Sequence, residues 1–200
     1  MNLAELAAKH GTDKEPNYLR NYARHFDPLR EREIHLLELG IFEGSSLKMW
    51  RDFFPNGVIA GLDLEPVEVD GCRTYAGSQD DVTVLDRIVD ECGPFDIVID
   101  DAAHIADPAR TSLWHLWPHL RVGGHYVIED WGTGYWADWP DGKRYRNAKH
   151  VAGMVGLIKE LVDECARADV THPRGTKEEE ESRIEYMEVA HGQVILIKAR

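Results

Sequence analysis

Residues 34–66 read IHLLELGIFEGSSLKMWRDFFPNGVIAGLDLEP, and this stretch decides the fold. Its opening, IHLLELG, is an apolar run with charge before it and glycine at its end, which predicts a buried strand. The middle part predicts a helix, because apolar residues recur there at helical spacing: Leu47, Trp50 and Phe54. Residues 58–66 then predict a second strand that ends in acids. The stretch is therefore a strand–helix–strand unit.

The same alternation continues along the chain. Residues 72–81 predict a weak third strand, and the later predicted elements are the strands 95–100 and 123–131 and the helices 82–92, 107–117 and 151–168. Residues 184–199 predict two strands around a tight His191-Gly192 turn. Short apolar strands without polar alternation indicate a parallel sheet covered by helices on both faces. We expect one α/β domain over residues 1–200, a doubly wound, mostly parallel Rossmann-like sheet with a C-terminal antiparallel hairpin.

The ends of two helical segments are predicted as well. Residues 1–30 are helical material interrupted by GTDKEPN, in which Pro16 and Asn17 mark a loop. Asp107 is the predicted N-cap of the following long helix, with Pro108 at the first helical position, where a missing N–H is harmless. The first 30 residues are therefore a helical extension that carries the GTDK motif.

The charge balance excludes several classes of partner. The formal net charge is −13, from 23 Lys and Arg against 36 Asp and Glu, whereas nucleic acids and anionic membranes favour basic surfaces. The three cysteines are widely spaced and lack zinc-site spacing, which is typical of reduced thiols in a cytoplasmic protein. No segment has the apolar character of a signal peptide or a membrane span. We therefore expect a cytoplasmic enzyme.

Residues after the first three strands form a pattern typical of a nucleoside site. Gly40 and Gly44 lie in the first strand–helix turn, where glycines let the backbone approach a ligand, although a plain tight turn would also use them. Asp63 ends the second strand, about 23 residues beyond Gly40, near the distance at which such folds place a ribose-binding acid. The polar loop 77–80 could meet an adenine edge. The turn is not GxGxxG, and the three features together suggest an adenosine ligand that carries no phosphate.

Four carboxylates follow the next two strands. Asp100 and Asp101 end one strand, and Glu129 and Asp130 end the other. Adjacent parallel strands lie about 4.8 Å apart, so these carboxylates would converge and repel by several kcal/mol unless a cation neutralises them. Hard oxygen ligands suit Mg²⁺, and no cysteine pair or histidine cluster suggests zinc. The sequence therefore predicts a Mg²⁺ site at this edge of the sheet.

Four separated motifs, ELGIFEGSSLKMW, GLDLEP, DIVIDDAAH and GGHYVIEDWGTGYW, together resemble class I S-adenosylmethionine (SAM) methyltransferases. More narrowly, they are similar to the metal-dependent sugar O-methyltransferases of macrolide biosynthesis, the mycinamicin and tylosin type. GTDK at 11–14 also resembles a motif found just ahead of that catalytic domain. The resemblance covers roughly residues 10–140, with the motifs in the same order and spacing.

The resemblance implies a set of cofactor-binding residues. The glycine turn would border the methionine part of SAM, Asp63 would hold the ribose hydroxyls, and Gln79 or Asp80 would lie by the adenine. Asp100 would face either the cofactor or the metal. The full implied set is Glu38, Gly40, Gly44, Ser45, Asp63, Leu64, Gln79, Asp80 and Asp100. Two alternatives stay open at this point, since Glu38 could pair with Lys48 or Arg51, and Asp80 and Asp81 could cap the following helix.

The resemblance also implies the metal ligands and the base. Asp101, Glu129 and Asp130 would hold Mg²⁺, with Asp101 counted among the catalytic residues, and His104 would take the proton of the acceptor hydroxyl. A lone histidine at such a position could equally be a surface or capping residue. Its place three residues after a metal carboxylate favours the base.

Residues 131–147 place several aromatic side chains in a polar, glycine-containing stretch. Aromatic residues this dense outside a helical or strand period indicate a lid or a substrate wall that could stack on a sugar. The alternatives are a dimer contact or a loop packed on the sheet. Trp114 and Trp117, at helical spacing, are predicted core residues.

The first functional hypothesis is a SAM- and Mg²⁺-dependent O-methyltransferase that acts on a sugar or other diol of a small natural product, as in antibiotic biosynthesis. A nucleotide-dependent oxidoreductase would need the absent GxGxxG, and a non-catalytic SAM-binding module would tolerate loss of the acidic cluster. The enzymes resembled carry an additional N-terminal domain, whereas only about 30 residues precede the first strand here. We therefore expect a homo-oligomer in which a neighbouring subunit completes the acceptor pocket.

Overall fold

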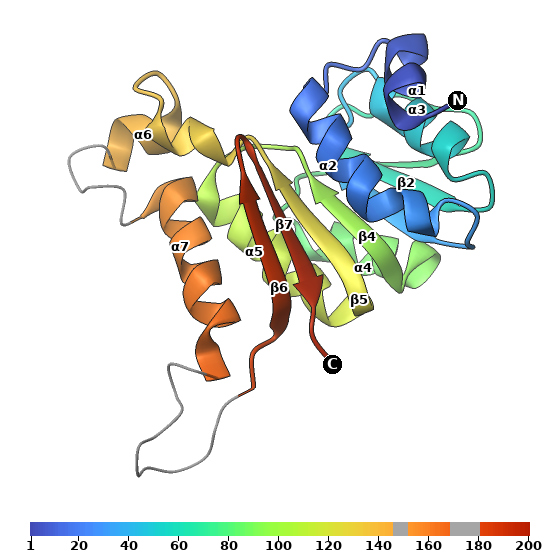
Figure 1. Ribbon diagram of the computed structural model, residues 1–200. Helices are drawn as coiled ribbons and strands as arrows, with labels where there is room; N and C mark the ends of the chain where they lie inside the picture. Colours follow the sequence, from blue (N-terminus) through green and yellow to red (C-terminus); the bar gives the residue numbers. More distant parts are fainter. Residues whose placement is uncertain (146–151, 169–180) are drawn as a thin grey trace.

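A seven-stranded mixed sheet forms the centre of the computed structural model, which describes residues 1–145, 152–168 and 181–200 (Figure 1). The strand order is β3-β2-β1-β4-β5-β7-β6. The strands are β1 (His35–Leu39), β2 (Val58–Asp63), β3 (Arg73–Ala76), β4 (Phe95–Asp100), β5 (Leu120–Glu129), β6 (Ile184–Ala190) and β7 (Gln193–Lys198).

The first five strands run parallel, and β7 pairs antiparallel with both β5 and β6. His191 and Gly192 connect β6 to β7, with Gly192 in the left-handed region at φ 71°. The predicted doubly wound sheet with its terminal hairpin is confirmed. The predicted weak third strand is also present, as β3.

Helices cover both faces of this sheet. The α-helices are α1 (Leu3–His10), α2 (Pro16–Phe26), α3 (Ser45–Phe53), α4 (Val82–Cys92), α5 (Ala106–Leu116), α6 (Pro140–Tyr145) and α7 (Gly153–Cys165). Short 3₁₀ turns add η1 (Asp27–Leu29), η2 (Trp117–His119) and η3 (Trp131–Tyr135). None of the helices in the described part of the chain combines the length and the apolar composition that a bilayer crossing requires.

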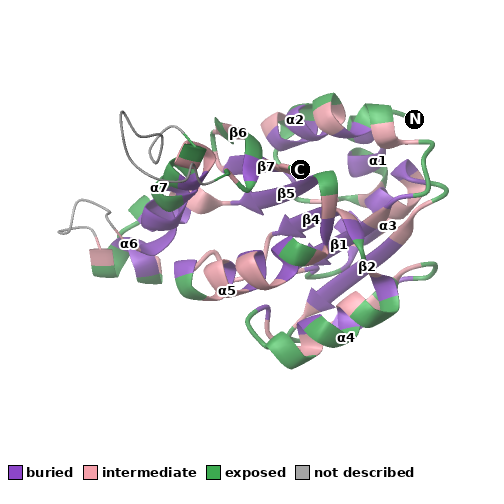
Figure 2. Ribbon diagram, turned by 90° about the horizontal axis from the view of Figure 1, so that it is seen from below, coloured by how far each residue is buried: buried purple, intermediate pink, exposed green. Residues whose placement is uncertain are grey.

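The two faces of β1 belong to different cores because successive strand side chains point in opposite directions. Leu36 packs in a core with α1, α2 and α3, whereas Leu37 and Leu39 pack in a second core with α4, α5 and α7. Figure 2 shows the resulting layer of buried strands between partly exposed helices. Trp117 is buried in the second core as predicted, and Trp114 packs against that core from a partly buried position.

Two predicted helix ends are wrong. Pro16 and Asn17 form the first turn of α2 instead of a loop, because proline at the first helical position lacks only an N–H that would have no partner there. Asp107 is not an N-cap. The helix α5 begins at Ala106, before Asp107, and its N-cap residue is Ile105. Asp107 instead lies in the first turn of α5, where its side chain is mostly exposed.

The carboxylate of Asp141 in α6, rather than Asp107, accepts a hydrogen bond from the first backbone N–H group of α5. Its Oδ2 accepts hydrogen bonds from the backbone N–H groups of Ala106, at 2.8 Å, and Met154, at 2.9 Å. These two residues lie in the first turns of α5 and α7, where N–H groups have no partner within the helix. One buried carboxylate therefore joins three helices near the end of the sheet.

A buried polar network lies beneath the carboxyl end of β4. Both carboxylate oxygens of Asp100 accept hydrogen bonds from Gln79 Nε2, at 2.9 and 3.0 Å, and Oδ2 also accepts one from Ser112 Oγ. The Gln79 Oε1 accepts the backbone N–H of Ala103 at 2.9 Å. Burial raises the pKa of Asp100 to about 6, although the hydrogen bond from Gln79 opposes the shift. The network fixes the loop that follows β4.

Replacing Asp141 by alanine should lower the free energy of unfolding by about 1–2 kcal/mol, because two helix N-termini lose their acceptor. Urea denaturation measures the difference. Asp107→Ala is the matched control, since its carboxylate lies on the exposed surface of α5, one of the two helices whose first turn Asp141 contacts, and we expect it to change the free energy by less than about 0.5 kcal/mol. Equal losses in the two variants would contradict the assignment.

Asp100 should make stability depend on pH. A carboxyl whose pKa rises from 3.8 to about 6 on folding stabilises the fold below the lower value and loses that contribution as pH rises through the higher one. The free energy of unfolding of the natural protein minus that of Asp100→Asn should therefore fall by about 2 kcal/mol between pH 4 and 7. Asp90→Asn, an exposed position on α4, controls for the lost charge. A difference that stays flat or rises over this range would refute the prediction.

Candidate functional site

A cavity of about 760 Å³ opens at the carboxyl ends of the parallel strands. This is the edge where open α/β sheets bind their ligands. Of the predicted site residues, those in its lining are Gly40, Ser45, Asp63, Leu64, Gln79, Asp101, His104 and Asp130. The others lie behind the lining or beside it: Glu38, Gly44, Asp80, Asp100 and Glu129. The cavity has two chemically different ends.

The first end is the turn between β1 and α3. A side chain at Gly40 would place its Cβ 2.2 Å from the carbonyl oxygen of Asp101, and the residue has φ 83°, so only glycine fits. The Asp63 carboxylate accepts the backbone N–H groups of Ile41, at 2.9 Å, and Phe42, at 3.0 Å. Burial would raise the pKa of Asp63, but these N–H groups outweigh it and hold the pKa below its ordinary value. Asp63 is therefore an ionised acceptor at the cavity wall.

Two further predicted residues lie near this end. Asp80 is exposed and accepts a hydrogen bond from the Ser78 hydroxyl at 2.5 Å. The cap of α4 is Asp81, whose carboxylate accepts the backbone N–H groups of Thr83 and Val84. The alternative that Asp80 and Asp81 cap the following helix is therefore confirmed for Asp81.

Three residues other than glycine have positive φ among the described residues, and all three line the cavity: Phe42 at 45°, His104 at 52° and Asp130 at 53°. Such a backbone costs on the order of 1–3 kcal/mol at each position and persists only where the surroundings enforce it. Strain of this kind gathers at functional sites. Its confinement to one cavity marks that cavity as the functional site.

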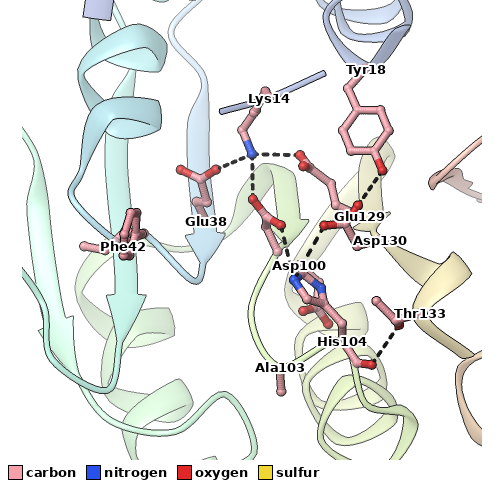
Figure 3. A network of polar contacts seen from close by, with 12 residues as sticks. Lys14, Tyr18, Glu38, Phe42, Asp100, Ala103, His104, Glu129, Asp130 and Thr133 are labelled. Carbon is pink, nitrogen blue, oxygen red and sulfur yellow. Dashed lines mark hydrogen bonds and ion pairs between the residues drawn. The ribbon is translucent and has the colours of Figure 1, made fainter. Parts of the chain in front are cut away.

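At the second end, the side chain of Lys14 enters the group of carboxylates (Figure 3). Its Nζ lies 3.0 Å from Glu38 Oε1, 2.9 Å from Asp101 Oδ2 and 2.8 Å from Glu129 Oε1. Burial lowers the pKa of Lys14, but the three carboxylates outweigh burial and hold it well above its ordinary value. Glu38 also accepts a hydrogen bond from Ser46 Oγ at 2.6 Å. Its predicted alternatives, Lys48 and Arg51, are therefore replaced by Lys14.

Glu129 lies deep in this group. Its Oε1 accepts hydrogen bonds from Lys14 Nζ and from the hydroxyl of Tyr22, and its side chain is 3% exposed. Burial, followed by the charge of Asp101, raises the pKa of Glu129, although Lys14 and Tyr22 oppose the shift. Burial therefore favours the neutral form of Glu129, and the contact with the Lys14 ammonium favours its ionised form.

A second, more open group faces the cavity. One ligand atom from each of Asp101, His104 and Asp130 lies within 4.8 Å of the other two. The His104 Nε2 is 3.9 Å from Asp101 Oδ1 and 3.7 Å from Asp130 Oδ2. The Tyr18 hydroxyl donates to the other Asp130 oxygen, Oδ1, at 2.5 Å. Two partly exposed carboxylates with room for water fit Mg²⁺, which prefers oxygen ligands and keeps several waters.

The aromatic segment after β5 packs against this group. Thr133 Oγ1 and Trp139 Nε1 both donate to the carbonyl oxygen of His104, each at 3.1 Å. Tyr135 and Trp136 are about half exposed, at 49% and 54%. The segment therefore holds the strained His104 backbone and presents two aromatic rings outward. Residues 146–147 of the predicted segment lie outside the described residues.

Sequence reasoning missed three residues of this site: Lys14, Tyr18 and Tyr22. Each of the three joins the N-terminal extension to the end of β5, more than a hundred residues away in the sequence. The GTDK motif was the available signal for Lys14, since it contains that residue. Spacing alone gives no signal for the two tyrosines, which read as part of the apolar face of α2.

Comparison with known proteins places the chain. No protein-family model matches it. The mycinamicin VI 2''-O-methyltransferase of Micromonospora griseorubida is 41% identical over 176 residues, which cover 81% of this chain and 43% of that protein. The 8-demethyl-8-(2-methoxy-alpha-L-rhamnosyl)-tetracenomycin-C 3'-O-methyltransferase of Streptomyces olivaceus is 40% identical over 86% of this chain and 47% of its own length. The chain thus spans about half the length of the curated relatives it matches.

Solved structures agree with these matches. The MycE methyltransferase from the mycinamycin biosynthetic pathway, in complex with Mg and SAH, aligns with all of this chain and 55% of its own, with a TM-score of 0.88 and 34% identity. An O-methyltransferase from Bacillus cereus in complex with SAH shares the fold at 13% identity, with a TM-score of 0.56. The chain is therefore a homologue of these sugar O-methyltransferases and belongs to the class I S-adenosylmethionine-dependent methyltransferases.

Proposed function

We propose that this chain is the catalytic part of a SAM- and Mg²⁺-dependent O-methyltransferase. The methyl group passes from the sulfonium of SAM to a hydroxyl oxygen on a sugar of a small natural product. The observation that carries the proposal is one cavity with Asp63 at one end and Asp101, His104 and Asp130 at the other. Relatives that methylate sugars of macrolide and tetracenomycin compounds, and a relative solved with Mg and SAH, support it.

The first end would bind the cofactor. Asp63, ionised and fixed by the turn, would accept the two ribose hydroxyls, and Gly40 and Ser45 would border the methionine part. Leu64 and Gln79, which line the same cavity, would lie beside the adenine. The remaining residues of the predicted set act from behind: Glu38 and Gly44 through the β1–α3 turn, Asp100 through Gln79, and Asp80 through the third loop.

The second end would hold the metal and the proton acceptor. Asp101 and Asp130 would bind Mg²⁺, and Glu129 would join them through Oε2, because Lys14 and Tyr22 are hydrogen-bonded to its Oε1. When bound, the ion supplies a lowered pKa and a fixed orientation to the acceptor hydroxyl. His104 would take the hydroxyl proton at Nε2, the ring atom that faces both carboxylates.

The exposed rings of Tyr135 and Trp136 would stack on the sugar or on the rest of the acceptor. Assembly as a homo-oligomer, with a neighbouring subunit at the acceptor pocket, and a cytoplasmic location stay predictions. The chain spans about half the length of its relatives, so one relative's acceptor is not assigned to it. We propose instead to screen glycosylated metabolites as acceptors.

The two ends should respond separately to substitution. Asp63→Ala should weaken S-adenosylhomocysteine binding at least about tenfold, which is 1.4 kcal/mol, while Mn²⁺ affinity stays within about twofold. Asp130→Ala should weaken Mn²⁺ binding at least about tenfold while S-adenosylhomocysteine affinity stays within about twofold. It should also abolish Mg²⁺-stimulated turnover. Isothermal titration of each ligand measures both effects, with NAD as a third ligand that should not bind the natural protein. Binding of NAD in place of S-adenosylhomocysteine would favour an oxidoreductase and contradict the proposed methyltransferase function.

His104→Ala should lower kcat by about 10²–10⁴-fold with little change in S-adenosylhomocysteine affinity, because the variant loses the proton acceptor but keeps the cofactor end. Methyl transfer to a panel of glycosylated polyketides gives the rate. His119→Ala, in the η2 turn at the opposite end of the sheet, is the control and should retain the natural rate. An unchanged kcat and pH–rate profile in His104→Ala would exclude the base assignment.

A further inference from the structure

The Lys14 ammonium lies among three carboxylates, the type of ligand that also binds hard metal ions. Its side chain is 1% exposed, and its ammonium contacts carboxylates from the ends of three adjacent strands, at Glu38, Asp101 and Glu129. A buried ammonium is unfavourable unless it is paired, and here the chain supplies three partners within 3.0 Å. Lys14 therefore balances charge at the inner part of the acidic group.

Asp101 connects this inner position to the open group. Its Oδ2 accepts a hydrogen bond from Lys14 Nζ at 2.9 Å, and its Oδ1 faces His104 Nε2 in the group that includes Asp130. One carboxylate thus bridges two places where a cation can sit. Bridged pairs of cations a few ångströms apart are a recurring arrangement in two-metal enzymes. Here an ammonium fills one of the two places.

We propose that Lys14 is the resident second cation of a carboxylate-bridged two-cation site, and that it limits the chain to one exchangeable divalent ion. The ammonium holds the inner position between Glu38 Oε1, Asp101 Oδ2 and Glu129 Oε1, and the divalent ion binds the outer position at Asp101 and Asp130, with Glu129 joining through Oε2. The inference rests on the proposed metal site. Lys14 is then a positioning residue, since it fixes the bridging carboxylate that faces the reacting end of the cavity.

Exposure explains why the inner cation is part of the chain. The side chains of Glu38 and Glu129 are 0% and 3% exposed, whereas those of Asp101 and Asp130 are 22% and 42% exposed. Mg²⁺ gives up its waters reluctantly and usually keeps several of them, so a closed position suits it poorly. An ammonium on the chain is dehydrated once, during folding. The open position retains room for water and for a substrate hydroxyl.

Neutral donors complete the inner position. Ser46 donates to Glu38 Oε2, and the hydroxyl of Tyr22 donates to the same Glu129 oxygen that Lys14 contacts. These hydroxyls orient the carboxylates but add no positive charge. Removal of the ammonium would leave three converging carboxylates without that charge, and a small side chain at position 14 would leave space for an ion with water.

The test is the number of Mn²⁺ ions bound by the full chain, measured by isothermal titration and by electron paramagnetic resonance, without SAM or acceptor. The natural protein should bind one ion. Lys14→Ala should bind two, with the spin-coupled signal of a carboxylate-bridged pair, and ethylammonium at high concentration should return it to one ion. Lys14→Arg keeps the charge and should bind one ion. Lys9→Ala, which removes a partly exposed lysine paired with Asp52, is the control and should also bind one.

Each other result decides against the inference. One ion of unchanged affinity in Lys14→Ala would overturn it and leave the proposed function intact, whereas no ion in the natural protein would overturn both. If Lys14→Ala is unfolded in chelator, circular dichroism during Mn²⁺ addition gives the same answer. Refolding that needs two ions per chain supports the inference, and failure to refold at saturating Mn²⁺ contradicts it.

Discussion

The site depends on one electrostatic constraint: carboxylates at the ends of neighbouring parallel strands must share cations. Glu38, Asp101 and Glu129 lie at or just after the ends of β1, β4 and β5, and the sheet geometry leaves them no freedom to separate. Burial first, and then the nearby charge of Asp101, raises the pKa of Glu129. The N-terminal extension supplies a positive charge there, because the side chain of Lys14 lies between these three carboxylates.

The extension thereby becomes part of the candidate site. Besides Lys14, it contributes the hydroxyls of Tyr18 and Tyr22, which contact Asp130 and Glu129. On the opposite side, Thr133 and Trp139 hold the carbonyl of His104. Segments before and after the parallel sheet thus hold different groups of the same site, and these contacts include the two residues with strained backbone conformations, His104 and Asp130.

The parallel sheet was predictable because its strands other than β3 are short apolar runs that each end at a glycine or an acid. The glycine turn and Asp63 were predictable for a similar reason, since spacing along a strand–helix–strand unit fixes where they lie. The tie between Asp141 and the starts of α5 and α7 was not, because the three groups meet only through tertiary packing. The contacts of Lys14 were not predictable for the same reason, because its partners lie up to 115 residues away in the sequence, at Glu129. Local patterns identify which residues are unusual, but packing decides which of them meet.

Anomalous diffraction from crystals grown with Mn²⁺ and S-adenosylhomocysteine tests the division of the acidic group most directly. The account predicts a manganese peak beside Asp101, Asp130 and Glu129 Oε2, with the Lys14 ammonium still between Glu38 Oε1 and Glu129 Oε1. A peak at the inner position with Lys14 displaced, or carboxylates that stand apart with no ion between them, would contradict it.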